Sequence, residues 1–123
     1  MFIMDDTTGD MTTRQGDSFS FTITGITDDW DVYFSVYKLT DRTIIFETRA
    51  TPENEVTTFN ITPAESNKLT VPSGKKTETY YYGIKRCKEG VEDTVIIGNK
   101  DVSAVNKILV YPLITEGAEN GAS

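Results

Sequence analysis

The feature that most constrains this chain is a strict alternation of apolar and polar side chains over short segments. In residues 18–25, Phe19, Phe21 and Ile23 alternate with serine and threonine. A period of two places apolar side chains on one face of a β-strand and polar side chains on the other. The apolar residues elsewhere are mostly Val, Ile, Phe and Tyr, which favour strands. The pattern therefore predicts strands that each bury one face.

Enough segments of this kind are present for one β-domain. We expect strands over residues 18–25, 30–38, 43–49, 56–61, 79–87, 94–98 and 107–111. After the fourth segment, Thr62 and Glu65 match a capping box around Pro63, which predicts a short helical turn. About seven strands at regular spacing, with no long helical period, indicate an antiparallel β-sandwich or barrel.

Alternation also assigns side chains to the two faces of each predicted strand. In the third segment we expect Ile44 and Phe46 to point inward. Tyr33, Tyr37 and Tyr81 fall on outward positions of their strands. Tyrosine is large and amphipathic and has few rotatable bonds, and it is enriched at protein interfaces. These three tyrosines are therefore our candidate interface residues.

The composition excludes several kinds of chemistry. The 123 residues contain no histidine and a single cysteine, Cys87. Nucleophilic mechanisms that need a serine–histidine or cysteine–histidine pair are therefore excluded, as are histidine metal sites and multi-cysteine zinc sites. The net charge of −7 opposes binding to a phosphate backbone. We expect a protein that is not an enzyme, has no catalytic residues and no cofactor, and does not bind nucleic acid.

One acidic turn resembles a cation site at first sight. Asp28, Asp29 and Asp31 are close together in the sequence. A calcium loop, however, needs ligands at alternating positions and a distal glutamate, and that spacing is missing here. We interpret the turn as a solvated connection between strands and expect no metal.

The ends of the chain differ from its centre in composition. We expect a flexible segment over residues 1–10, a sandwich domain over 11–114 and a disordered tail over 115–123, which is small and polar. The apolar start at residues 1–4 is followed by two aspartates and has no basic region before it, unlike a secretory signal. No apolar run is long enough to span a bilayer, and we expect no membrane partner.

Three stretches of the sequence carry a family resemblance. They are residues 14–21 (RQGDSFSF), residues 30–36 (WDVYFSV), and a closing block formed by residues 80–85 (YYYGIK), 94–98 (TVIIG) and 108–111 (ILVY). Together they resemble small phage and prophage virion domains, in particular the immunoglobulin-like N-terminal domain of phage baseplate upper proteins. The resemblance covers about residues 11–114.

The resemblance implies a fold and a function. It implies that the antiparallel β-sandwich of about seven strands and one short helical turn, which the pattern predicts, is immunoglobulin-like. It also implies a non-enzymatic virion protein of the tail, baseplate or neck, made in the bacterial host cytoplasm, which contacts other virion proteins and itself as a homo-oligomer. An alternative stays open, a carbohydrate-binding β-sandwich that contacts host-surface polysaccharide. That alternative needs two or more aromatic rings exposed in one concave strip.

Overall fold

The computed structural model describes residues 1–98 and 105–115, which form nine strands and one short helix. The elements in chain order are β1 (Phe2–Met4), β2 (Met11–Arg14), β3 (Phe19–Thr24), β4 (Asp31–Tyr37), β5 (Ile44–Ala50), β6 (Val56–Ile61), α1 (Pro63–Ser66), β7 (Glu78–Lys88), β8 (Val91–Val95) and β9 (Asn106–Tyr111). The predicted fold class, an all-β sandwich with one short helical turn, is confirmed.

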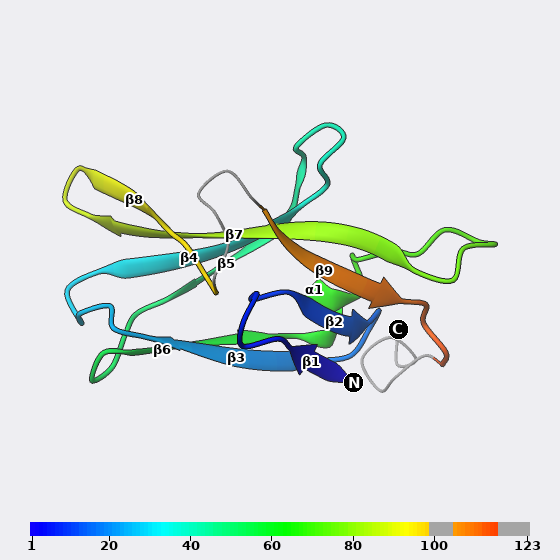
Figure 1. Ribbon diagram of the computed structural model, residues 1–123, viewed down its shortest axis with the longest axis horizontal. Coiled ribbons are helices and arrows are strands. Elements are labelled where there is room, and N and C mark those ends of the chain that lie inside the picture. The colour runs from blue at the N-terminus through cyan, green and yellow to red at the C-terminus, as the bar shows by residue number, and fades with distance from the viewer. Residues whose placement is uncertain (99–104, 116–123) are drawn as a thin grey trace.

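Two sheets of unequal size form the layers of the sandwich (Figure 1). The large sheet has the strand order β1-β2-β9-β7-β4-β5, and β8 also pairs with β7. The small sheet consists of β3 and β6, which pair antiparallel over their whole length. The eleven-residue strand β7 pairs with β9 through its first half and with β8 through its second half. One long strand thus joins both halves of the large sheet.

The prediction of an entirely antiparallel arrangement is wrong at one pair of strands. β2 runs parallel to β9, with Met11 opposite Ile108 and Arg14 opposite Tyr111. These partners lie almost a whole chain apart, and β2 has only four residues. Alternation over so short a segment carries no information on which distant strand it will pair with. The large sheet is therefore mixed.

The N-terminal segment also differs from the prediction of a flexible stretch over residues 1–10. Phe2–Met4 forms β1, which pairs with β2, and the Phe2 ring stacks on Phe19 with 4.7 Å between ring centroids. The Gly9 carbonyl accepts a hydrogen bond of 2.5 Å from the Tyr82 hydroxyl. These contacts tie the segment to both sheets. Of the predicted tail over 115–123, all but the first residue lies outside the described residues.

The core centres on the aromatic ring of Phe34, which is fully buried in β4. Four other rings surround it at centroid distances of 5.0 to 6.2 Å, and they come from both sheets: Phe21, Phe46, Phe59 and Tyr82. Burying one such side chain contributes about 1.5–3 kcal/mol. This cluster holds the two layers together.

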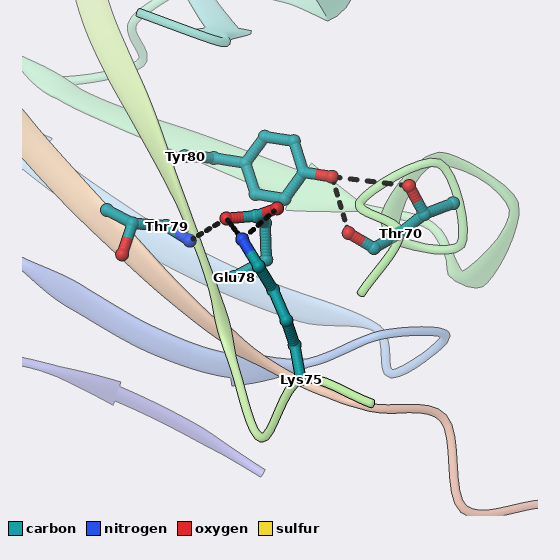
Figure 2. Close-up of polar contacts among 5 residues, drawn as sticks. All are labelled: Thr70, Lys75, Glu78, Thr79 and Tyr80. Atoms are coloured by element: carbon teal, nitrogen blue, oxygen red, sulfur yellow. Dashed lines mark hydrogen bonds and ion pairs between the residues drawn. The ribbon is translucent and has the colours of Figure 1, made fainter. Parts of the chain in front are cut away.

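The corner between the layers is formed by α1 and the start of β7. Thr62 and Glu65 make the capping box that the sequence predicts, with each side chain accepting the other residue's backbone N–H. Further along, the Tyr80 hydroxyl donates to the Thr70 carbonyl at 2.6 Å (Figure 2). This bond ties the start of β7 to the backbone ten residues earlier in the chain.

Two local predictions need correction. Ile44 does not point inward: a bulge in the β4–β5 pairing beside Tyr37 shifts the register, and Ile44 is 55% exposed. Its neighbour Ile45 packs against the core instead. The strand expected over 94–98 is β8, which begins earlier, at Val91. Both errors arise from hairpin geometry, because a bulge or an early turn moves the register by one or more residues.

Candidate functional site

The three candidate tyrosines lie together on the outward face of the large sheet, the face turned away from β3 and β6. Tyr33 and Tyr37 come from β4, and Tyr81 comes from β7 directly opposite Tyr37. All three are half-buried, and the Tyr37 and Tyr81 ring centroids lie 6.2 Å apart. We call this region, with the residues between them, the tyrosine face. The structure thus brings together the three residues that the sequence singled out separately.

Strand register arranges the tyrosine face in three rows that cross β5, β4 and β7. The rows are Ile44–Tyr37–Tyr81, Glu47–Ser35–Gly83 and Arg49–Tyr33–Lys85. Neighbouring rows are about 7 Å apart, because side chains on one face repeat every two residues. The two outer rows carry tyrosines, whereas the middle row carries the small residues Ser35 and Gly83 next to Glu47.

The middle row forms a depression, which we call the slot. A Cβ atom built on Gly83 has no neighbour within 4 Å, so the space above this glycine is open. Beside it, Ser35 Oγ donates a hydrogen bond of 2.5 Å to Glu47 Oε2. The slot belongs to a groove of about 710 Å³ that continues along β7 to the β7–β8 turn.

Charges around the tyrosine face are mostly paired. Arg49 forms an ion pair with Asp31 at 3.2 Å, and Lys85 forms one with Glu92 at 3.2 Å. Glu47 is exposed and, within residues 1–98 and 105–115, no lysine or arginine lies within ion-pair distance of it. Its carboxylate is thus an acceptor at one end of the slot.

A second charged group lies at the far end of β4. The Trp30 ring is covered by Arg86 at 4.5 Å and by Lys88 at 5.1 Å from its centroid. Lys88 also donates to Asp29 at 2.5 Å, and this bond, together with one from Thr27, lowers the pKa of Asp29 to about 2. Trp30 packs partly against the core, so this group is a structural cap on the sheet.

The acidic turn has a structural role in the fold. Asp28 accepts hydrogen bonds from the backbone N–H groups of Asn54 and Glu55 at 3.0 and 2.9 Å. Both of those residues have positive φ, a backbone conformation that residues other than glycine rarely adopt. The Asp28 carboxylate therefore stabilises an uncommon backbone turn. Its neighbours Asp29 and Asp31 are bonded to Lys88 and Arg49. Among the described residues, no group of three or more His, Cys, Asp or Glu side chains is placed to hold a metal ion.

The remaining reactive side chains lie outside the three rows of the tyrosine face, and Cys87 lines the continuation of the groove along β7. Burial, followed by the nearby Asp10 charge, raises the pKa of the Tyr82 hydroxyl, which bonds the N-terminal segment. Cys87 is a free, half-buried thiol at the end of β7. Sequence reasoning missed Gly83, Ser35 and Glu47 as a group. The available signal was an isolated glycine in the middle of a strand, which often marks a close approach of another chain or a ligand.

Comparison with known proteins does not assign the chain to a family. No family model matches the chain, and no curated protein matches it either. The resemblance to phage virion domains therefore stays a prediction from the sequence. In the part of the chain that the structure describes, no helix is both long and apolar enough to cross a membrane.

Proposed function

We propose that this protein is a non-enzymatic phage structural protein, a β-sandwich assembly module of the tail, baseplate or neck. It acts in the virion through protein–protein contacts with other virion proteins and with copies of itself. The observation that carries the proposal is the tyrosine face, where Tyr33, Tyr37 and Tyr81 stand half-exposed on one side of a rigid sheet. Exposed aromatic side chains on a rigid scaffold are typical anchors of protein interfaces.

Two further observations support an assembly role. The sequence has no histidine and only one cysteine, which excludes nucleophilic mechanisms that need a serine–histidine or cysteine–histidine pair. The resemblance of residues 14–21, 30–36 and the closing block to phage virion domains gives the class of particle. Placement in the virion rests on this resemblance alone.

Immunogold electron microscopy tests the proposal. Antibody against this chain is applied to phage particles produced from the genome that encodes it. We expect gold at a fixed position on the tail, baseplate or neck. Absence of the protein from purified particles, by labelling and by mass spectrometry, overturns the virion assignment.

The tyrosine face is tested by self-association of the purified protein. Tyr81→Ala is expected to weaken association at least tenfold in sedimentation velocity, because it removes a ring that packs against Tyr37. Thr22→Ala, an exposed position on β3, is the matched control and should leave association unchanged. If both variants self-associate as strongly as the wild type does, the tyrosine face is not part of the interface.

A carbohydrate-binding sandwich is the second candidate, and one observation favours it. The Tyr37 and Tyr81 rings lie 6.2 Å apart beside a groove of about 710 Å³, and such rings stack on the apolar faces of sugars. A glycan array with the wild type and Tyr81→Ala separates the candidates. Strong binding to bacterial polysaccharide that the substitution abolishes favours this reading over protein assembly.

A further inference from the structure

The slot in the middle of the tyrosine face has a shape and a charge that together specify an occupant. We propose that the slot binds an arginine side chain of a partner protein. This inference rests on the proposed function, because it names the chemistry of the partner at the same face. Three properties of the slot support it: the missing bulk at Gly83, the tyrosines on either side, and the Glu47 carboxylate, which has no basic partner in the part of the chain that the structure describes.

The shape of the slot suits one inserted side chain. Gly83 and Ser35 form its floor. Apart from Gly83 and the residues on either side of it in the sequence, no atom lies within 4 Å of a Cβ built on Gly83. Tyr37 and Tyr33 stand one row away on either side, so the tyrosine rows are about 14 Å apart. A gap of this width between aromatic side chains admits a single long side chain that approaches from solvent.

The charge of the slot selects a cation. Glu47 lies in the same row as Ser35 and Gly83 and has no basic partner among the described residues. The wider groove is lined by four carboxylates and two lysines, and the whole chain carries a net charge of −7. The two lysines are held by other carboxylates, Lys85 by Glu92 and Lys88 by Asp29. Within the described residues, an incoming cation therefore meets a carboxylate at the end of the slot that is bonded to the Ser35 hydroxyl and to no lysine or arginine.

Arginine fits these features better than lysine does. Its guanidinium is planar, binds a carboxylate through two parallel hydrogen bonds and stacks on aromatic rings. Its apolar stem covers the floor at Gly83 while its head reaches Glu47. Lysine offers a point charge without the stacking surface, so it should bind more weakly.

Gly83→Val is the sharpest test variant. It fills the slot without changing the net charge, and valine suits a strand position whose surroundings are open. We therefore expect Gly83→Val to fold with a thermal unfolding midpoint equal to or above that of the wild type. Glu47→Gln removes the charge and keeps the shape. Glu53→Gln makes the same charge change outside the tyrosine face and is the matched control.

The probe is the peptide acetyl-Gly-Arg-Gly-amide, titrated into ¹⁵N-labelled protein and followed by NMR. We expect saturable shifts confined to the amides of Ser35, Gly83 and their row neighbours in β4, β5 and β7. Binding should be lost in Gly83→Val, weakened at least fivefold in Glu47→Gln and unchanged in Glu53→Gln. The matching peptide with citrulline, which is neutral, should not bind.

Several outcomes overturn the proposal that the slot binds arginine. One is a set of amide shifts spread over all acidic residues, and another is equal peptide binding by the wild type and Gly83→Val. Equal binding of the citrulline peptide also overturns it, because the charge would then play no part. If the peptide fails but Tyr81→Ala still weakens self-association, the slot proposal fails and the assembly function stands. If the peptide binds and the protein is absent from phage particles, the slot proposal stands and the assembly function in the virion fails.

Discussion

The two sheets of this sandwich bury similar side chains and present very different surfaces. The outer side of the large sheet carries tyrosines, ion pairs and a groove, whereas β3 and β6 contain no ionisable residue at all. The exposed positions of the small sheet are Ser20, Thr22, Thr24, Val56, Thr58 and Asn60. Although the chain has a net charge of −7, its two sandwich layers differ, and the strands that carry ionisable side chains all belong to the large sheet.

This contrast shows that the outward faces, unlike the buried ones, can differ in the side chains that they offer to a partner. Inward positions of both sheets must satisfy packing, so Phe21, Phe34 and Phe59 meet in one cluster. Outward positions have no such constraint. Large aromatic side chains gathered on an outward face are therefore better evidence of binding than buried ones. The small sheet supplies the other half of the core and offers only small, uncharged groups to a partner.

The largest expected effect tests whether the two sheets are one cooperative unit. Phe34→Ala removes the ring that contacts Phe21, Phe46, Phe59 and Tyr82. It should lower the free energy of unfolding by about 3–5 kcal/mol, because the cavity lies between both layers. Urea unfolding monitored by circular dichroism and by tryptophan fluorescence measures the loss. Two separate transitions would show that the sheets unfold independently, against this expectation.

A smaller effect distinguishes the interiors of the two sheets. Thr57 in β6 is fully buried, and among the described residues its hydroxyl has no hydrogen-bond partner. Thr57→Val replaces this hydroxyl with a methyl group, and should raise the free energy of unfolding by up to about 1 kcal/mol. The same urea unfolding experiment measures the gain.

The matched control is a buried threonine of the large sheet. Thr13 is equally buried, but its hydroxyl donates to the Met1 carbonyl at 3.0 Å. Thr13→Val should therefore lower the free energy of unfolding by about 1 kcal/mol. Destabilisation by both substitutions would mean that Thr57 is satisfied by a partner such as water.

The sequence predicts the local elements well and the long-range pairings poorly. The capping box at Thr62 and the alternation in β3, β4 and β6 are contained in a few neighbouring residues, so their patterns predict the elements to within a residue or two. The strands β1 and β2 have three and four residues. Their places in the sheet depend on β9, which follows about a hundred residues later, and no local pattern records that pairing.

The candidate site follows the same rule. Alternation alone places Tyr33, Tyr37 and Tyr81 on outward positions. That Tyr81 stands opposite Tyr37, and Gly83 opposite Ser35, depends on the register between β4 and β7, strands separated by more than forty residues. The slot therefore depends on the register between β4 and β7, which the sequence pattern does not predict.

The smallest expected effect concerns the charges at the edge of the large sheet. The bond from Lys88, with that from Thr27, lowers the pKa of Asp29 from 3.8 to about 2. A carboxylate with a lowered pKa stabilises the fold above its ordinary pKa, and that contribution is lost as the pH falls from 3.8 towards 2. Because the pair is exposed, its effect on stability should be slight. A ¹³C NMR titration of the carboxyl group should give a midpoint near pH 2.

Lys88→Ala isolates the cause of this shift. It should raise the pKa of Asp29 towards 3.8, while Asp41, whose pKa is lowered mainly by its bond from Thr43, should titrate unchanged. Between pH 5 and pH 2, amide shifts should move along the rim of the large sheet and stay constant through the centres of β3 and β6, which carry no titratable group. Equally large shifts in both sheets would mean that acid loosens the shared core. The contrast between a charged face and a neutral face would then not explain how the protein responds to pH.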